Sequence, residues 1–206
     1  MSTRSNQEQA IYSSLVYPGT EVLRNKLGIT NQTDLDNAEA EIVALCEPTR
    51  PTFKKFTLSE MQAAHKHLLG GLYDWAGQIR TYTTGRGAAS FARPEYIESY
   101  FESAVLKPLQ RENYLKGTGR EQFTERSAHF ANEANAVHPF VDGNGRITRL
   151  FLKDLALLAG FNLDIKRLEA NNGAWYAAMK EGFEQGDATQ LKNEILAALD
   201  SLKKAR

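Results

Sequence analysis

The residues most able to do chemistry lie between positions 138 and 149, in the run His-Pro-Phe-Val-Asp-Gly-Asn-Gly-Arg-Ile-Thr-Arg. His138 is the one side chain of this run that takes up a proton near neutral pH, which makes it the candidate general base. Asp142 offers a carboxylate, and one carboxylate with substrate phosphates is the usual way that proteins hold Mg²⁺. The run therefore combines a base with a candidate metal ligand.

The same run has the features of a phosphate site. It joins two apolar stretches and predicts a loop that enters a helix N-terminus, where unpaired N–H groups and the helix dipole attract anions. Gly143 and Gly145 let a ligand approach the backbone closely. Arg146 and Arg149 are three positions apart, and both can reach phosphate oxygens in a forked geometry.

Each of these residues has an ordinary structural explanation when taken alone, such as packing, capping, a tight turn or a solvated helix face. Their combination within twelve residues favours a functional site. The run is not the Gly-x-x-x-x-Gly-Lys-Ser/Thr phosphate loop. It is not a dinucleotide fingerprint either, because no strand precedes it.

The composition limits the partners of the chain. The 206 residues contain 25 Lys+Arg and 25 Asp+Glu, so the formal net charge is zero, which argues against direct binding of nucleic acid. No apolar run approaches the roughly 20 residues that span a bilayer, and the polar N-terminus lacks the apolar core of a signal peptide. A single cysteine, Cys46, excludes an intramolecular disulfide framework and suits a reducing compartment. We expect a soluble cytoplasmic protein with no membrane partner.

The elements that must position the run are mostly helical, because long stretches without proline repeat apolar residues at the helical interval. The expected helices span 20–27, 34–46, 58–71, 95–115, 121–137, 146–159, 171–183 and 187–202. Residues 1–19 are expected to be a loosely held lead-in. Residues 81–93 carry β-formers followed by glycines, which predicts a small β-hairpin or flap. The length fits one domain over residues 1–206 with a core at about 15–200.

Outside the run, the aromatic and imidazole side chains have structural explanations. His65 falls on the apolar stripe of the 58–71 helix and is expected to be a satisfied core residue. Tyr73, Trp75 and Trp175 are expected in the core as well.

Residues 138–149 resemble the signature of the Fic (filamentation induced by cAMP) family, His-Pro-Phe-x-Asp/Glu-Gly-Asn-Gly-Arg-x-x-Arg, at every fixed position. Residues 73–80 resemble the family's segment before the flap. Asn171-Asn172 and Trp175-Tyr176 resemble its nucleotide-pocket helix, and the segment 17–27 resembles the start of compact, toxin-like bacterial members. The resemblance implies an all-α Fic fold, a helical bundle core with a small β-hairpin flap.

The resemblance also implies an activity, that of a protein adenylyltransferase (AMPylator), which transfers AMP from ATP to a Ser, Thr or Tyr hydroxyl of a target protein. By this resemblance His138 deprotonates the target hydroxyl and Asp142 holds Mg²⁺ against the α- and β-phosphates. Phe140 is expected to anchor the loop in the core. The implied cofactors are ATP and Mg²⁺.

The resemblance assigns the nucleotide contacts residue by residue. Asn144, with the backbone N–H groups of Gly143 and Gly145, is expected to form the anion hole. Arg146 and Arg149 are expected to bind the outer phosphates, with Arg149 at the γ-phosphate.

Two further groups of residues are implied around the loop. Asn172 and Tyr176 share a helix face and are expected at the adenine. The flap is expected to hold an extended target segment by strand addition. The flap residues that the resemblance implies are Gly85, Arg86 and Gly87 at the turn and Phe91 as a clamp on the target.

Many members of the family carry an inhibitory Ser/Thr-x-x-x-Glu-Gly/Asn motif whose Glu pairs with the second signature arginine. No Ser or Thr of this chain has Glu four residues later. We therefore expect either constitutive activity or a small antitoxin that supplies the Glu near Arg149 in trans, as in a toxin–antitoxin pair. By analogy, type II topoisomerase subunits are one target class.

Three alternatives stay open at this stage. The chain could transfer another phosphate-containing group, although relatives that transfer phosphate lack the second signature glycine, which is present here as Gly145. It could be a secreted effector that modifies host proteins. It could also be a non-catalytic Fic binding module, although no signature position is degenerate.

Overall fold

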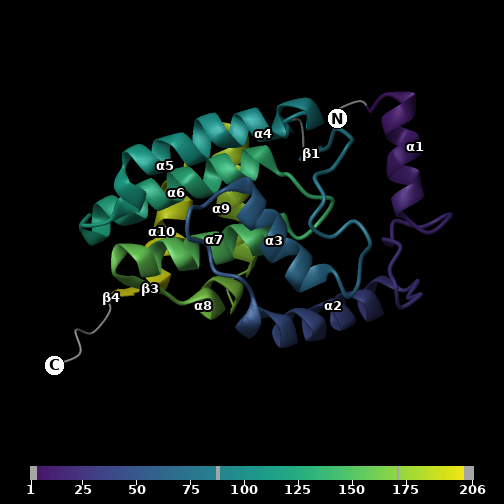
Figure 1. The fold of residues 1–206 in the computed structure, drawn as a ribbon, viewed down its shortest axis with the longest axis horizontal. Helices are drawn as coiled ribbons and strands as arrows, with labels where there is room; N and C mark the ends of the chain where they lie inside the picture. The colour runs from purple at the N-terminus through teal and green to yellow at the C-terminus, as the bar shows by residue number, and fades with distance from the viewer. Residues whose placement is uncertain (1–3, 87–88, 171, 202–206) are drawn as a thin grey trace.

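The computed structural model of the protein describes residues 4–86, 89–170 and 172–201. Helices dominate the part described (Figure 1). The α-helices are α1 (Asn6–Leu15), α2 (Gln32–Cys46), α3 (Leu58–Leu69), α4 (Ile97–Tyr100), α5 (Lys107–Arg111), α6 (Arg120–Val137), α7 (Asn144–Ala159), α8 (Ile165–Ala170), α9 (Asn172–Gln185) and α10 (Thr189–Ala198). Shorter helical turns are η1 (Glu47–Thr49), η2 (Pro94–Tyr96), the π-helical η3 (Phe101–Leu106) and η4 (Asn113–Leu115). The all-α fold expected from the sequence is confirmed.

Helices α6 and α7 lie in the middle of the bundle, and the other helices surround them (Figure 1). Helix α7 turns large apolar side chains such as Leu150, Phe151 and Leu155 into the core, where each is at most 1% exposed. Burying each of them stabilises the fold by about 1.5–3 kcal/mol. Because α6 ends and α7 begins within this core, the loop between them is held at both ends.

A buried ion pair joins α7 to the segment that follows η1. Arg50 donates to both carboxylate oxygens of Asp154, at 2.8 and 2.6 Å, and the N–H of Phe53 donates to the same carboxylate at 2.7 Å. Both charged side chains are less than 10% exposed. A paired and hydrogen-bonded charge of this kind tolerates burial, whereas removal of one partner would leave the other unpaired.

One small β-hairpin and one antiparallel pair of strands distant in sequence complete the part of the fold described. Strands β1 (Gly85–Arg86) and β2 (Ala89–Ser90) pair Gly85 with Ser90, which confirms the hairpin expected at 81–93. Strands β3 (Phe161–Leu163) and β4 (Leu199–Ser201) pair Leu163 with Leu199. The helix expected at 187–202 therefore ends at Ala198, because the chain becomes extended there to join β3.

Two expectations for the N-terminal segment are wrong. Residues 20–27 do not form a helix, because this segment turns back and pairs with the residues before it. The N–H of Tyr17 donates to the carbonyl of Val22, and the N–H of Arg24 donates to the carbonyl of Leu15. The lead-in contains helix α1, which Ser5 starts through reciprocal bonds with Glu8, a capping box.

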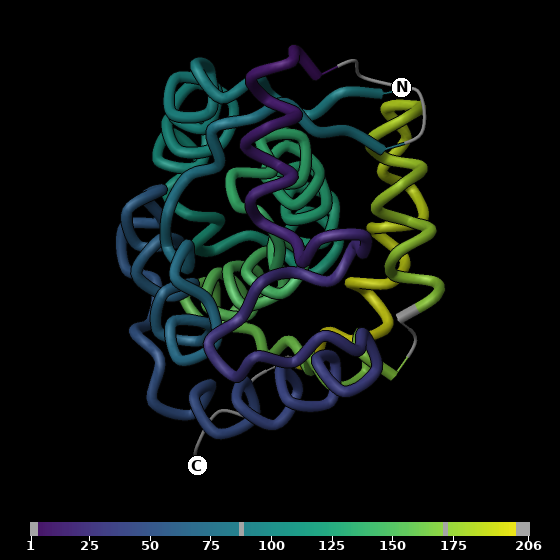
Figure 2. The backbone as a smooth tube through the Cα atoms, turned by 90° about the vertical axis from the view of Figure 1, so that its right-hand side faces the viewer, coloured from purple at the N-terminus to yellow at the C-terminus, as the bar shows by residue number. Residues whose placement is uncertain are grey.

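Helix α1 is attached to the segment that enters the hairpin, and the two run side by side in Figure 2. Glu8 accepts the N–H of Thr83 at 2.7 Å, and the Arg4 side chain donates to the carbonyl of Thr83 at 3.1 Å. The ring of Tyr12 meets the ring of Tyr82 edge-on. The N-terminal helix therefore supports the base of the flap.

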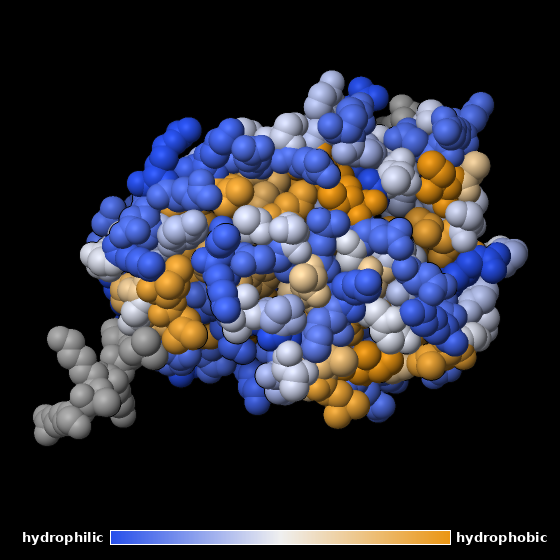
Figure 3. All heavy atoms as spheres, viewed as in Figure 1, coloured by the Kyte–Doolittle hydropathy of each residue, from blue (hydrophilic) through white to orange (hydrophobic). Residues whose placement is uncertain are grey.

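The surface in Figure 3 shows apolar side chains in small groups between polar ones, including a group at the lower edge over α2. The most exposed large apolar side chain of the part described, Leu45 at 79%, belongs to that helix. In the described ranges, no helix combines the length and apolar character needed to cross a membrane.

Candidate active site

His138 lies where α6 ends, in a left-handed backbone conformation with φ 45° and ψ 62°. Its N–H still donates to Ala134 as the last bond of the helix, at 3.2 Å. A residue with a side chain rarely adopts this conformation, which costs roughly 1 kcal/mol or more and persists only where the surroundings enforce it. The turn aims the imidazole away from the helix axis and toward the flap.

Arg80 enforces this turn from the base of the flap. Its guanidinium donates to the carbonyl oxygens of His138 at 2.7 Å, Tyr82 at 2.7 Å and Val137 at 3.3 Å, and also to that of Ala92. The side chain is only 2% exposed. Arg80 thus joins both sides of the flap to the end of α6, a role that sequence reasoning missed because its partners are backbone atoms of distant residues.

The imidazole of His138 is stacked against the flap. Its ring lies parallel to that of Phe91, with centroids 3.8 Å apart and an angle of 3° between the planes. Phe91 stacks in turn on Phe183 of α9, at 4.5 Å. Burial, with the positive charges of Arg86 and Arg80, lowers the pKa of His138 to about 3. The imidazole is therefore neutral at pH 7, so one of its ring nitrogens has a free lone pair.

The position of Phe91 differs from the expected clamp on a target segment. The side chain is only 4% exposed, because the rings of His138 and Phe183 cover it. Phe91 therefore supports the imidazole of His138 and leaves almost none of its own ring accessible to a target segment.

The loop after His138 is closed by Phe140 and Asn144. The Phe140 ring is fully buried and stacks on His65 with centroids 4.0 Å apart, as expected of a core anchor. The side-chain amide of Asn144 accepts the N–H of Phe140 and donates to its carbonyl, both at 2.9 Å. This reciprocal pair engages Oδ1 and one of the two N–H groups of Nδ2, so the Asn144 side chain holds the loop closed.

His65 supports the loop from below. The N–H of Gly77 donates to Nδ1 of His65 at 2.8 Å, so Nδ1 carries no proton and Nε2 donates to the carbonyl of Asp142 at 2.9 Å. Burial lowers the pKa of His65 to about 4, which keeps this neutral form at pH 7. The expected satisfied core histidine is confirmed, and the structure adds that it orients the loop.

Gly143 follows Asp142 at the point where α7 begins, with φ 76°. A Cβ atom there would lie 2.9 Å from Cδ1 of Leu69 and 3.2 Å from Nε2 of His65. Glycine is required by both the backbone conformation and the close approach to α3. No side chain caps α7, so its first N–H groups remain available to a ligand.

The carboxylate of Asp142 is exposed at the rim of the loop. Desolvation by the surrounding protein atoms and the negative charge of Glu39 raise the pKa of Asp142 above its ordinary value. The described residues hold no group of three or more His, Cys, Asp or Glu side chains that could by themselves bind a metal ion. A cation at Asp142 would therefore need ligands from a substrate or from water.

The two signature arginines lie on the first turns of α7. Arg146 pairs with Glu39 of α2 at 2.7 Å, and Arg149 lies 3.5 Å from Glu169 of α8. Nη1 of Arg146 and Nε of Arg149 are buried and have no hydrogen-bond partner among the described residues. Unpaired buried donors are costly, and an anion that reached them would remove the cost.

The flap and α9 meet beside this loop, as Figure 2 shows. The guanidinium of Arg86 lies 4.5 Å above the ring of Tyr176, which is 53% exposed. Gly85 pairs with Ser90 in the hairpin. Gly87 lies outside the described residues, and Asn172 begins α9 with a side chain that also lies outside them.

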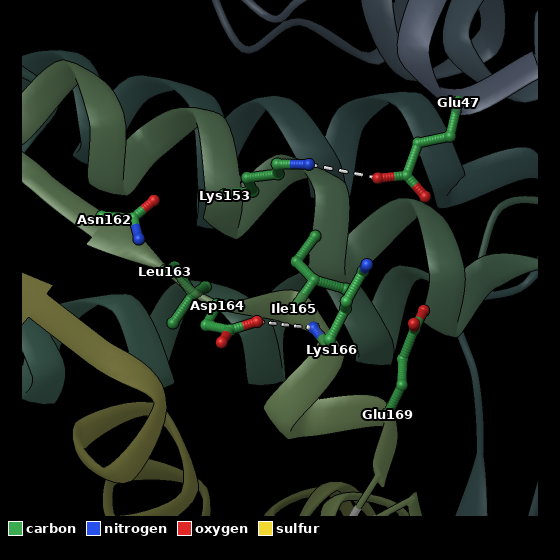
Figure 4. Close-up of a pocket in the computed structure, with 8 residues that line it drawn as sticks. All are labelled: Glu47, Lys153, Asn162, Leu163, Asp164, Ile165, Lys166 and Glu169. Carbon is green, nitrogen blue, oxygen red and sulfur yellow. Dashed lines mark hydrogen bonds and ion pairs between the residues drawn. The ribbon is translucent and has the colours of Figure 1, made fainter. Parts of the chain in front are cut away.

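A shallow pocket lies between Glu47, helix α7 and the segment from β3 to α8 (Figure 4). Glu47 and Lys153 pair across it at 3.1 Å, and Glu169 forms part of its lining. The pocket is separate from His138, but it shares Glu169 with the ion pair to Arg149.

Comparison with known families identifies a match to one domain family. The sequence model of the Fic/DOC family matches residues 55–156, which include α3, the flap and most of α7. The matched segment contains His138 and both signature arginines.

Comparison with curated proteins gives similar chains of similar length. The chain is 36% identical to the "Probable protein adenylyltransferase y4lH" of Sinorhizobium fredii, over 90% of this chain and 95% of that protein. It is 35% identical to the "Probable protein adenylyltransferase Fic" of Escherichia coli, over 86% of this chain and 87% of that protein.

Comparison with solved structures gives the same fold. The structure resembles that of BepC, a VirB-translocated effector protein of Bartonella tribocorum with bound AMPPNP, with a TM-score of 0.83 and 25% sequence identity. The match covers 93% of this chain and 98% of the BepC chain.

Proposed function

The chain belongs to the Fic/DOC family and is a protein adenylyltransferase, and we propose that it transfers AMP from ATP to a Ser, Thr or Tyr hydroxyl at the loop 138–149. The observation that carries the proposal is the meeting of three features on one loop. They are the neutral imidazole of His138, the exposed carboxylate of Asp142, and the unpartnered guanidinium nitrogens of Arg146 and Arg149. The AMPPNP bound to BepC supports a nucleotide as the ligand.

In the proposed mechanism His138 is the general base. Its Nδ1 is buried and its ring is fixed by Phe91, so Nε2 is the nitrogen that accepts the proton of the target hydroxyl. The hydroxyl oxygen attacks the α-phosphorus, the new O–P bond forms, and the bond to the β-phosphate breaks. Pyrophosphate leaves, and its charge is stabilised by Arg146, Arg149 and the first N–H groups of α7.

Asp142 would hold Mg²⁺ together with phosphate oxygens of the nucleotide. Its exposed carboxylate at the rim of a phosphate site has the chemistry that Mg²⁺ prefers. When bound, the ion would neutralise phosphate charge during the transfer. The negative charge of Glu39, together with desolvation, raises the pKa of Asp142. A cation at Asp142 would relieve the repulsion between these two carboxylates.

Target and adenine contacts are proposed around the flap. An extended target segment would add to the hairpin by main-chain bonds near Gly85 and Arg86. The exposed ring of Tyr176, with Asn172 on the same helix, would contact the adenine base, and Arg86 above that ring would close the flap over it.

We also propose that the protein acts in the cytoplasm as the toxin of a toxin–antitoxin pair. A small antitoxin would place a glutamate against Arg149, whose ion pair with Glu169 is 3.5 Å long and involves a carboxylate that is 47% exposed. A type II topoisomerase subunit is the first target to test. A secreted effector is the second candidate, which the similarity to BepC favours.

The position of the label in ATP tests the proposed reaction. Purified protein is incubated with Mg²⁺, a bacterial lysate and ATP labelled on either the α- or the γ-phosphate. The proposal predicts a protein band labelled from the α-phosphate alone. Label from the γ-phosphate would indicate phosphoryl transfer, and no label from either, with ATP still bound, would indicate a binding module.

A further inference from the structure

Glu39 meets the catalytic loop from a distant part of the sequence. It lies on α2, 107 positions before Arg146, and its Oε1 accepts from Nη2 of that arginine at 2.7 Å. Leu35 and Val43, four positions to either side, are buried, so Glu39 is on the inner face of the helix. Its side chain is only 12% exposed. A carboxylate on a core-facing position requires partners, and Arg146 is one of them.

The second oxygen of Glu39 is also engaged. Oε2 accepts the hydroxyl of Tyr73 at 2.8 Å. Tyr73 is 2% exposed and stacks on Trp75 with centroids 4.4 Å apart. Burial and the nearby charge of Glu39 raise the pKa of Tyr73, so the hydroxyl keeps its proton and remains a donor. The carboxylate is therefore fixed at both oxygens by groups that are themselves held in place.

The contact leaves part of Arg146 available. Nη2 is bound to Glu39, whereas Nη1 is buried without a partner among the described residues. The pair of Arg149 with Glu169 differs, since it is 3.5 Å long and its glutamate is 47% exposed. A short, buried contact to one nitrogen orients a guanidinium, while a long contact to an exposed carboxylate does not.

We propose that Glu39 is a positioning residue for the nucleotide: it fixes the guanidinium of Arg146 so that the free nitrogen meets the outer phosphates of ATP. This inference rests on the proposed function, because it requires a nucleoside triphosphate at the loop. Glu39 does not touch the ligand. It acts through Arg146, and its charge also lies close enough to Asp142 to favour a cation there.

The test compares the affinities of ATP and AMP, because AMP lacks the phosphates that Arg146 would bind. Calorimetry with each nucleotide and Mg²⁺ is performed on the wild type, Glu39→Gln, Tyr73→Phe and Glu112→Gln. Tyr73→Phe removes a hydrogen bond from Glu39 but leaves its contact with Arg146. Glu112→Gln breaks a partly buried ion pair with Arg126, 2.8 Å at Nε, on another side of the bundle.

The expected result is a loss confined to ATP in Glu39→Gln. ATP affinity should fall by about 10-fold to 100-fold, by analogy with the loss when a residue that supports a metal ligand is removed, while AMP affinity stays unchanged. Glu112→Gln should bind both nucleotides within a few-fold of the wild type. Tyr73→Phe keeps the contact between Glu39 and Arg146, so it should lose less ATP affinity than Glu39→Gln and no AMP affinity. In an Arg146→Gln background, Glu39→Gln should add little further loss, because the two residues act as one unit.

Three results would overturn the inference. The first is an ATP affinity of Glu39→Gln equal to that of the wild type. The second is an equal loss of affinity for ATP and AMP, which would indicate a structural role. The third is tighter binding of ATP, which would indicate that Glu39 competes with phosphate for Arg146. Failure of the proposed function gives a different pattern, since ATP would then bind equally to the wild type and to Arg146→Gln, whatever residue occupies position 39.

Discussion

Replacement of Gly143 by alanine tests how strictly the loop geometry depends on its contact with α3. The left-handed conformation at φ 76° costs alanine about 1–2 kcal/mol. The added Cβ would also lie 2.9 Å from Leu69 and 3.2 Å from His65, which is held by two hydrogen bonds and cannot move freely. Overpacking of this kind costs about 1–3 kcal/mol. We expect Gly143→Ala to lose about 2–5 kcal/mol of the free energy of unfolding.

Gly160→Ala is the matched control. Gly160 ends α7 with φ 93°, and apart from its immediate neighbours in the chain and the helix backbone, no described atom lies within 4 Å of the position its Cβ would take. It should lose only the conformational cost of about 1–2 kcal/mol and bind ATP as the wild type does. Urea denaturation and an ATP titration on the three proteins measure both effects. Equal losses of stability, with ATP affinity unchanged in Gly143→Ala, would refute the role assigned to the contact with α3.

Three further predictions concern His65, Glu169 and Glu8. The pKa of His65 in the folded protein, about 4, lies below the ordinary 6.5, so its contribution to the free energy of unfolding is complete above pH 6.5 and is lost as the pH falls through 4. In urea denaturation, the difference in the free energy of unfolding between the wild type and His65→Gln should therefore narrow by about 3 kcal/mol from pH 7 to pH 4. A difference that stays constant would contradict the neutral state of His65. Glu169→Gln should change ATP affinity by less than about fivefold in calorimetry, because the ion pair between Glu169 and Arg149 is long and its carboxylate is exposed. A larger gain in ATP affinity would show that Glu169 inhibits nucleotide binding in cis. Glu8→Gln should speed hydrogen exchange at the Thr83 amide without changing ATP affinity, and unchanged exchange would show that α1 does not support the flap.

The sequence predicts the candidate site well where its residues are contiguous. His138, Asp142 and the two arginines fall in one run, so their chemistry and the helix N-terminus between them can be inferred from spacing alone. The helical bundle and the hairpin follow from apolar periodicity and from the glycines of the flap. These features depend on residues that are close together in the sequence, so their spacing is enough to predict them.

The supporting residues could not be predicted in the same way. Arg80, His65 and Glu39 contact the loop through bonds that span between 58 and 107 positions, and no local pattern marks such partners. The sequence places Phe91 in the flap and so predicts a contact with the target, but its burial against distant rings leaves no local pattern. Helix α1, by contrast, carried a readable signal, the Ser5-x-x-Glu8 capping box.

One paired measurement tests whether His138 acts in the transfer step while the rest of the loop binds the nucleotide. ATP affinity and the rate of AMP transfer to a labelled target are compared in the wild type, His138→Ala and His129→Ala, a control histidine that packs on Phe130 away from the loop. We predict that His138→Ala binds ATP within a few-fold of the wild type while its transfer rate falls by about 10²–10⁴-fold, the usual contribution of a general base. Transfer by His138→Ala at the wild-type rate would contradict the account.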